Sequence, residues 1–328
     1  MADKIITFNN LKSFKQKFDT AVAAELSKKQ DIITDLEEIR TKVNEAAPIE
    51  SLSGVALSGD YEDLVNKPEE ASQSDIEDLF PEVVASLADI KALNSDPSVD
   101  HIYVMLTDDI SAGNDDIVFR KNAAIDLNRH ELKFDDWGLE VRAGASLTVA
   151  NGEISSSESA FYVREQAALT INSGNYTTTN NFVIGTNGNS GKGDNTITIN
   201  GGTFNGSMSA AGKTAGYIAC GIYVANSDTL IVKSGVVLNV EDGCGICARS
   251  GHTILEDGVI INATGTGSGK VGDSPIQVPM GAKLVLDLKA DYPGGKPDIT
   301  IGDQLYDEEY VLAHPEETAA AGIYVLKD

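Results

Sequence analysis

A unit of about 22–24 residues recurs through the middle of the chain, and no other feature constrains the fold as strongly. The segments that begin at Cys220 and Cys244 align with an offset of 24, which closes to 23 at Gly235 and Gly258. Each unit holds short segments in which apolar and polar residues alternate, and a glycine marks a turn. Because one unit cannot bury its apolar side alone, the units are expected to stack on one another.

The same unit occurs earlier in the chain as three copies of one motif. The copies read Leu147-Thr-Val-Ala-Asn-Gly, Leu169-Thr-Ile-Asn-Ser-Gly and Ile197-Thr-Ile-Asn-Gly-Gly, each preceded by a short apolar segment. Further units are expected to begin near Ile117 and Ile276. Within the motif, Asn172 and Asn200 occupy equivalent positions, which predicts an inward or turn-facing stack of asparagines bonded from one coil to the next. The alternative is that these asparagines are simply polar surface residues.

This period predicts a mainly β fold, a parallel β-helix over residues 99–305. Stacked at ~4.8 Å, about eight coils would form a prism of ~40 Å. The alternation places four side chains in its interior, and a slip of one residue would turn each of them outward. These predicted core residues are Leu169, Ile222, Leu230 and Ile246.

Residues 1–47 have helical periodicity and are predicted to form an N-terminal α-helical stalk that ends at Pro48. The apolar stripe favours a coiled coil, and the alternative is an amphipathic helix packed on its own domain. The stripe that would hold the oligomer together consists of Leu11, Phe14, Phe18, Ile32, Leu36, Ile39 and Val43.

Two segments flank the predicted repeat domain. Residues 48–98 form a connector with a short helix over 74–92, where Ser74 and Glu77 match a capping box and Pro81 breaks or restarts the helix. Residues 306–328 leave the repeat and are predicted to cap its exposed sheet ends, with the 74–92 helix as the candidate cap at the other end.

Composition excludes several classes of protein. The formal net charge of −25 disfavours binding to nucleic acid and to anionic membranes. We find no apolar run long enough to span a membrane and no secretion signal at the start of the sequence. Three clustered cysteines are too few for a disulfide framework, which is typical of synthesis in a reducing cytosol.

Two segments resemble known families. The segment Val55-Ala-Leu-Ser-Gly-Asp-Tyr-Glu-Asp-Leu-Val-Asn-Lys-Pro68 resembles a connector of bacteriophage head and tail fibre proteins, where it also follows an N-terminal helix. The segments 101–110 and 124–132 are similar to the first coils of pectin-lyase-like right-handed β-helices. With the coiled-coil stripe, the resemblance implies a homotrimer in the virion, made in the host cytoplasm and attached by its stalk to another virion protein.

No group of residues indicates a catalytic or metal site, and we predict no cofactor. The acidic pairs at 108–109, 115–116 and 135–136 lie at turns, and neighbours on a strand face opposite sides. Cys244 and Cys247 form a C-x-x-C motif, but no fourth ligand accompanies them, and Cys220 stacks with Cys244 in the repeat. Arg142, Arg164 and Arg249 project from different coils without a matching cluster of aspartates.

Long connections rich in Gly, Ser, Thr and Lys interrupt the repeat at 185–195, 205–219 and 263–274. The last two follow equivalent strands and should emerge from one edge of the prism, where insertions often mark a binding side. The alternative is that these loops are insertions without a binding role, or that they fill the space between subunits of an oligomer. The residues predicted to bind a ligand there are Asn205, Ser207, Lys213, Tyr217, Thr264, Thr266, Ser268 and Lys270.

The sequence therefore predicts a virion structural protein, a head-fibre or decoration-type appendage that adheres to host-surface or environmental glycans and is not an enzyme. The overall acidic charge favours neutral glycans as the ligand. Two alternatives remain open. One is a tail fibre or tailspike whose carboxylates meet across subunits and degrade polysaccharide as a glycosidase or lyase, and the other is a bacterial surface adhesin.

Overall fold

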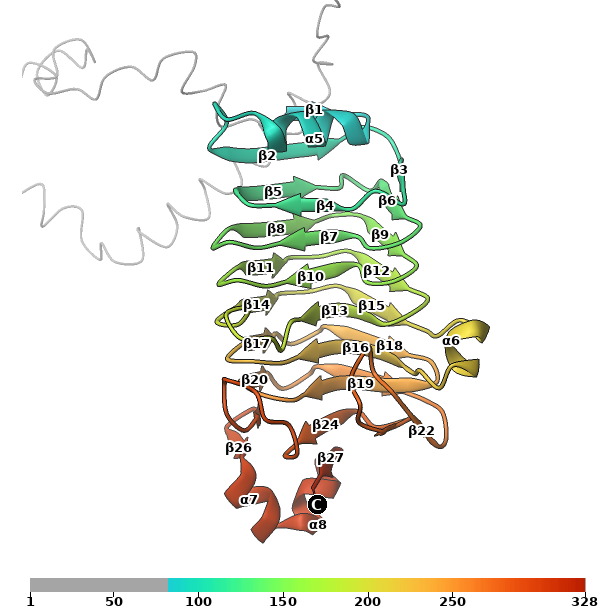
Figure 1. Ribbon diagram of the computed structural model, residues 1–328, viewed down its shortest axis with the longest axis vertical. Helices are drawn as coiled ribbons and strands as arrows, with labels where there is room; N and C mark the ends of the chain where they lie inside the picture. The colour runs from blue at the N-terminus through green and yellow to red at the C-terminus, as the bar shows by residue number, and fades with distance from the viewer. Residues whose placement is uncertain (1–81, 328) are drawn as a thin grey trace, which may run out of the picture. The chain divides into compact units, whose positions relative to one another are not determined.

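The computed structural model describes residues 82–327, here called the coil body, which consist almost entirely of short strands (Figure 1). The chain passes through three sheets in a fixed order, named A, B and C, and then enters the next layer of all three. Strands adjacent in these sheets pair in parallel with partners about one repeat apart in sequence, except that the strand Gln304–Tyr306 pairs antiparallel with Asp298–Ile301. The fold is mainly β, with long parallel sheets that are consistent with a parallel β-helix.

The three sheets run through the successive layers, each with its strands in chain order or its reverse. Sheet A contains β1 (Glu82–Val84), β2 (His101–Leu106), β5 (Asn122–Asp126), β8 (Ser146–Ala150), β11 (Ala168–Ile171), β14 (Thr196–Ile199), β17 (Thr229–Val232), β20 (His252–Leu255), β25 (Asp298–Ile301) and β26 (Gln304–Tyr306). Sheet B contains β3 (Ile110–Gly113), β6 (Glu131–Phe134), β9 (Glu153–Ser156), β12 (Asn175–Thr178), β15 (Thr203–Gly206), β18 (Val237–Val240) and β21 (Ile260–Ala263). Sheet C contains β4 (Ile117–Phe119), β7 (Leu139–Val141), β10 (Phe161–Val163), β13 (Phe182–Thr186), β16 (Ala219–Val224), β19 (Gly243–Ala248), β24 (Leu284–Asp287) and β27 (Ile323–Leu326).

The predicted core residues are confirmed. Leu169 pairs with Ile197, which pairs with Leu230, and on sheet C Ile222 pairs with Ile246. All five side chains are buried in one apolar cluster that runs through the coil body. Burial of a Leu or Ile side chain contributes about 1.5–3 kcal/mol relative to exposure, so this continuous column is a main source of stability.

The turn glycines also behave as the repeat predicts. Gly235 and Gly258 have φ values of +85° and +93°, which side chains with a Cβ rarely adopt. A backbone hydrogen bond from the Gly235 N–H to the Gly258 carbonyl links these two turns across adjacent layers. The glycine in the repeat therefore marks a turn whose backbone requires it.

At the N-terminal end, the described part of the predicted 74–92 helix is helical only from Leu87 onward. Residues 82–84 form β1, which pairs in parallel with β2, and the helix α5 begins at Leu87 and ends at Ser95. A capping box of Ser86 and Asp89 starts α5. Ile90 of α5 is buried against the core, so this helix closes the end of the coil body as expected (Figure 1).

At the C-terminal end, the described part of the predicted cap, residues 306–327, holds two short helices and one further strand. After β26 the chain forms α7 (Glu308–Ala313) and α8 (Pro315–Ala320) and then returns as β27. β27 pairs in parallel with β24 and so extends sheet C by one more strand. Within residues 307–327, α7 and α8 lie outside the three sheets, whereas the apolar segment 323–326 adds a strand to sheet C.

The unit expected near Ile276 does not begin there. Between β21 and β24, the chain forms a small antiparallel pair of β22 (Ser268–Gly269) and β23 (Val278–Pro279). The sheet C strand of this layer is β24, which is rich in Leu and Val. The segment around Ile276 instead packs on the outside of sheet C.

The stalk residues 1–47, the fibre-like connector 55–68, and Ser74, Glu77 and Pro81 lie outside the described residues. Within residues 82–327, no helix is long and apolar enough to cross a membrane.

Candidate functional site: an aromatic pocket on the outer face of sheet C

Sheet C is buried on both faces over part of its length. Every residue of β13, β16 and β19 is buried, including residues such as Tyr223 and Cys247 that pack outside the core cluster. A second apolar cluster covers their outer face, and it includes Val271 and Val278 from the β21–β24 connection. On β7 and β10 the outward residues Glu140 and Tyr162 are only partly buried. The outer face of sheet C is thus accessible at these two strands.

Aromatic side chains line this face in a continuous stack. The ring centroids of Trp137 and Tyr162 are 5.4 Å apart, and the rings are tilted by 60°. Tyr162 stacks on Phe182 at 6.2 Å, and Phe182 stacks on Tyr223 at 5.6 Å. Phe182 and Tyr223 lie in the covered part, so Trp137 and Tyr162 form the accessible end of the stack.

A glycine makes room for this stack. Gly185 pairs with Tyr162 on one side and with Tyr223 on the other, so it occupies the outward position between them. A Cβ at Gly185 would lie 1.8 Å from Cε2 of Phe182. The Phe182 ring therefore covers Gly185 and bridges the two tyrosines.

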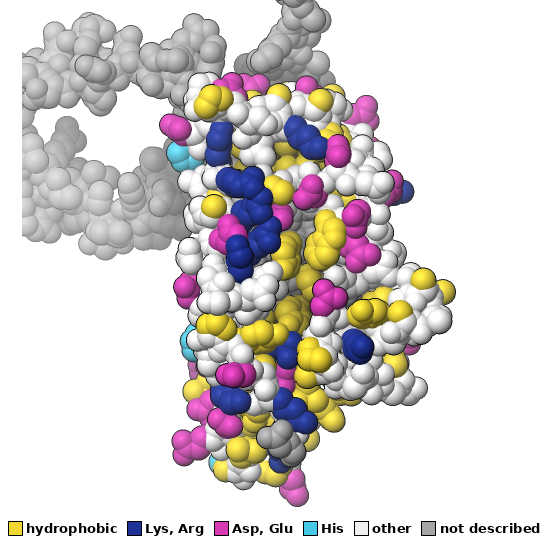
Figure 2. All heavy atoms as spheres, in the orientation of Figure 1, with side chains coloured by type: hydrophobic (Ala, Val, Ile, Leu, Met, Phe, Trp, Pro, Cys, Tyr) yellow, Lys and Arg dark blue, Asp and Glu magenta, His cyan; other side chains and the backbone are white. Residues whose placement is uncertain are grey.

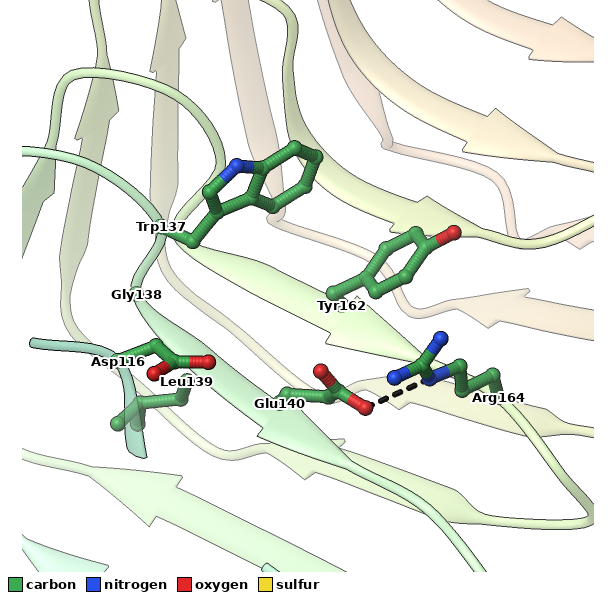
Figure 3. A pocket seen from close by; sticks show the side chains of 7 residues that line it. All are labelled: Asp116, Trp137, Gly138, Leu139, Glu140, Tyr162 and Arg164. Atoms are coloured by element: carbon green, nitrogen blue, oxygen red, sulfur yellow. Dashed lines mark hydrogen bonds and ion pairs between the residues drawn. The ribbon is translucent and has the colours of Figure 1, made fainter. Parts of the chain in front are cut away.

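A pocket of about 240 Å³ opens beside Trp137 and Tyr162 (Figure 3). Small-molecule pockets usually measure ~300–1,000 Å³, so this one suits a single sugar-sized ring whose neighbours remain outside. The lining combines two aromatic rings with two carboxylates and one guanidinium. Its residues are Asp116, Trp137, Gly138, Leu139, Glu140, Tyr162 and Arg164.

Glu140 lies at the centre of the polar side of the pocket. Its Oε1 accepts a hydrogen bond from Nε of Arg164 at 2.6 Å and lies 3.3 Å from Nη1 of Arg142. Burial raises the pKa of Glu140, and the hydrogen bond from Arg164 acts against that rise. The carboxylate of Asp116 adds to it by like-charge repulsion.

The two walls of the pocket hold each other in place. The guanidinium carbon of Arg164 lies 5.7 Å from the centroid of the Tyr162 ring, within reach of a cation–π interaction. The Tyr162 hydroxyl accepts a hydrogen bond from Nδ2 of Asn187 at 2.7 Å. Because Asn187 follows β13, the next strand of sheet C, this bond fixes the tyrosine edge of the pocket to the next layer.

Arg249, which the sequence predicts to project from a different coil than Arg142 and Arg164, is buried. Its Nε donates to Oδ2 of Asp287 at 2.7 Å, and the two side chains are 5% and 0% exposed. Its Nη1 donates to the hydroxyls of Tyr223 at 3.0 Å and Tyr292 at 2.5 Å. This arginine therefore ties the segment around Tyr292 to the covered part of sheet C.

The predicted loop edge is confirmed in its geometry. α6 (Ala210–Thr214) follows β15, and the 264–283 segment follows β21, so both leave the same edge of sheet B (Figure 1). The two segments meet in a bridge between Tyr217 and Lys270. Tyr217 also packs beside Met208.

The polar residues predicted to bind ligand at this edge are partly engaged within the protein. Nζ of Lys213 is 2.7 Å from Oδ2 of Asp242. The hydroxyls of Ser207 and Thr264 donate to backbone carbonyls, at 3.2 Å and 3.4 Å respectively. Thr266 and Ser268 are exposed. The structure thus brings Tyr217 and Lys270 together, while Lys213, Ser207 and Thr264 form bonds within the protein.

Asn205, the eighth predicted residue, belongs to an asparagine ladder on sheet B. Its Nδ2 donates to Asn175 at 2.8 Å, and its Oδ1 accepts from Asn239 at 3.0 Å, which in turn accepts from Asn262 at 3.0 Å. The predicted stack of Asn172 and Asn200 is also confirmed, at 2.8 Å. These amides link one layer to the next.

The cysteines are buried and reduced, and Cys220 pairs with Cys244 as the repeat predicts. Burial raises the pKa of Cys220, whereas hydrogen bonds among the thiols together with burial raise the pKa values of Cys244 and Cys247. Within residues 82–327, no group of His, Cys, Asp or Glu is arranged to hold a metal ion.

Comparisons with known proteins identify no relative of this chain. No protein-family model matches the chain, and neither a curated protein nor a solved structure matches it.

The sequence holds a partial signal for this pocket. Trp137 is the only tryptophan of the chain and stands two residues before the apolar pair of β7. Glu140 and Tyr162 are the outward residues between apolar pairs, and in the structure they are register partners. An alignment of the outward positions of successive units places Glu140 and Tyr162 side by side, whereas the inward apolar positions carry no such signal.

Proposed function

We propose that the coil body is a carbohydrate-binding body and that the Trp137–Tyr162 pocket holds a sugar ring. The observation that carries this proposal is the combination of two partly exposed aromatic rings with charged hydrogen-bonding groups in one small pocket. Aromatic faces suit the apolar faces of sugar rings, while Glu140 and Arg164 offer acceptors and donors to hydroxyl groups.

The larger setting of this proposal is a virion appendage. It is supported by the resemblance of residues 55–68 to fibre connectors and by the apolar stripe of residues 1–47. In this proposal the N-terminal helix forms a coiled-coil stalk that trimerises the chain and attaches it to another virion protein. The coil body is proposed to be a right-handed β-helix that projects outward and adheres to host-surface or environmental glycan.

Binding at each site is expected to be weak, roughly millimolar or about −4 kcal/mol, because the pocket is small. Adhesion would then depend on many copies acting together on one particle.

Affinity electrophoresis of the full chain through gels that contain bacterial surface polysaccharides tests this proposal. A retarding polysaccharide should be found, and Trp137→Ala should abolish the retardation. Tyr217→Ala is the matched control, because it removes an aromatic ring from the loop edge instead. Thermal melts establish that both variants are folded. If Trp137→Ala stays retarded while Tyr217→Ala does not, the ligand binds at the loop edge and the pocket proposal is wrong.

A polysaccharide-degrading enzyme is the second candidate function. Glu140 and Asp116 place two carboxylates in one pocket, and burial raises the pKa of Glu140, as a general acid requires. Against this candidate, two arginines pair with Glu140 and favour its ionised form. Release of new reducing ends from a bound polysaccharide, lost in Glu140→Gln, would establish the enzyme.

A further inference from the structure

Three arginines occupy equivalent positions at the corner beside the pocket. Arg120, Arg142 and Arg164 each come directly after a strand of sheet C, namely β4, β7 and β10. The backbone N–H groups of Arg142 and Arg164 continue the ladder by donating to Phe119 and Val141. With neighbouring strands ~4.8 Å apart, the three side chains form a row, here called the arginine row, along the coil axis.

The arginine row makes this corner cationic on a strongly acidic protein. The chain has a formal net charge of −25, yet Figure 2 shows Lys and Arg side chains gathered in a column beside hydrophobic side chains on the face in view. Lys121 and Lys192 lie next to the row in the same corner turns. These five cations lie near four carboxylates, those of Asp96, Asp116, Glu140 and Glu165. Lys192 pairs with Glu165, and Nζ of Lys121 donates to the backbone carbonyl of Asp96.

The arginine row is not fully satisfied by these carboxylates. Glu140 alone is shared between Arg142 and Arg164. Nε of Arg142 is buried and has no hydrogen-bond acceptor among the described residues. Arg120 is exposed, and its charge helps to lower the pKa of Glu165. Guanidinium groups whose N–H donors lack acceptors favour the binding of an anion.

We infer that the pocket selects an acidic saccharide, whose sugar ring lies against Trp137 and Tyr162 and whose carboxylate is bound by the arginine row. This inference rests on the proposed function and adds the ligand class to it. A planar carboxylate matches the fork of a guanidinium and accepts two parallel hydrogen bonds. It replaces the neutral glycan expected from net charge, because a ligand responds to the local charge of its site and more distant charges are screened by salt.

Calorimetric titration of the full chain with uronic-acid oligosaccharides tests the inference. The probes are tetrasaccharides of glucuronate, mannuronate and galacturonate, each compared with its carboxyl-reduced neutral form. We expect at least one acidic probe to bind about tenfold more tightly than its reduced form. We also expect this preference to shrink as the salt concentration rises.

Arg120→Gln separates ligand recognition from folding, because Arg120 is exposed. It should weaken binding of the acidic probe by about tenfold and leave the neutral probe unaffected. Arg129→Gln, which removes an exposed arginine from the turn before β6, is the matched control and should change neither. A sulfated neutral tetrasaccharide forms a further arm, and stronger binding of sulfate than of carboxylate would overturn the choice of carboxylate.

The outcomes distinguish the two levels of the proposal. If neutral and acidic forms bind equally well and Trp137→Ala abolishes both, the pocket binds sugars but the inference about acidic ligands is wrong. If Trp137→Ala changes neither affinity, the proposed function itself fails. If no uronic-acid probe binds better than its reduced form, the inference is overturned.

Discussion

Gly185 occupies an outward position of sheet C, and its lack of a side chain makes room for a neighbouring aromatic ring. Its hydrogen atoms leave space for the Phe182 ring, which stacks on Tyr162 and on Tyr223. The partly exposed rings of the pocket thus continue into buried rings, and this continuity holds Tyr162 in position.

Gly185→Ala should therefore displace the Phe182 ring, lower the free energy of unfolding by about 1–3 kcal/mol and weaken glycan binding. Gly206→Ala is the matched control, because a Cβ there would meet its neighbours at 3.5 Å or more. Denaturant unfolding of the two variants provides the comparison. Equal stability of both variants would show that the Phe182 ring moves aside without loss.

Asp228 is fully buried, and its two carboxylate oxygens are treated differently. Oδ1 accepts hydrogen bonds from the backbone N–H of Asn195 at 2.9 Å and from its side chain at 2.8 Å, whereas Oδ2 has no partner among the described residues. Burial raises the pKa of Asp228 to about 6 from 3.8.

Because its pKa is higher in the folded state, Asp228 binds more protons there between pH ~4 and ~6, and its contribution to stability falls as the pH rises through this window. The fall should amount to about 3 kcal/mol for a shift of about two pH units. The Asp228→Asn side chain cannot ionise, so this variant should not show the fall. Unfolding curves at pH 4 and pH 7 measure the change in the free energy of unfolding for both proteins. The same pH slope in both proteins would contradict the raised pKa.

At the scale of the elements, a buried ion pair holds the outer layer on sheet C. Arg249 follows β19, Asp287 ends β24, and the guanidinium also binds the hydroxyl of Tyr292 from the next connection. Two strands and one connection thus depend on a single guanidinium.

Asp287→Asn leaves the positive charge of Arg249 buried without its partner and should lower the free energy of unfolding by about 3–5 kcal/mol. Replacing both residues, as Arg249→Met with Asp287→Leu, should recover part of that loss because no unpaired charge remains. Urea unfolding of the single and double variants measures both effects. A single variant as stable as the parent protein would show that the pair does not hold this layer.

The elements also show what the repeat could and could not predict. Inward positions recur at a fixed spacing because each layer must fill the same interior, so Leu169 and Ile222 could be placed from sequence. The 264–283 segment has no such constraint, and its antiparallel pair was missed. The pocket was missed because Trp137 and Glu140 lie 22 or more residues from Tyr162 and meet only through the register of sheet C.

At the scale of the whole molecule, charge is distributed unevenly. Net charge predicted a neutral ligand because it averages over the chain, whereas the arginine row concentrates cations at one corner of the coil body. The stacked layers produce this concentration, since equivalent positions of successive repeats become neighbours in space.

The proposed trimer also belongs to this scale. Ile32, Leu36 and Ile39 lie on the apolar stripe of residues 1–47, and replacing all three with Asp should convert trimers to monomers and prevent incorporation into particles. Light scattering of the purified variant measures the first effect, and its content in assembled particles measures the second. Trimers that still form and still incorporate would show that the stalk assignment is wrong.

The most direct test of the glycan-binding account uses the single tryptophan of the chain as its reporter. The fluorescence of the full chain arises at Trp137 when tryptophan is excited selectively, so a ligand in the pocket must alter it. Titration with oligosaccharides of a polymer that the protein retains should give a saturable change, which Tyr162→Ala weakens and Tyr217→Ala leaves intact. A protein that binds the oligosaccharide while its Trp137 fluorescence stays constant would contradict the account.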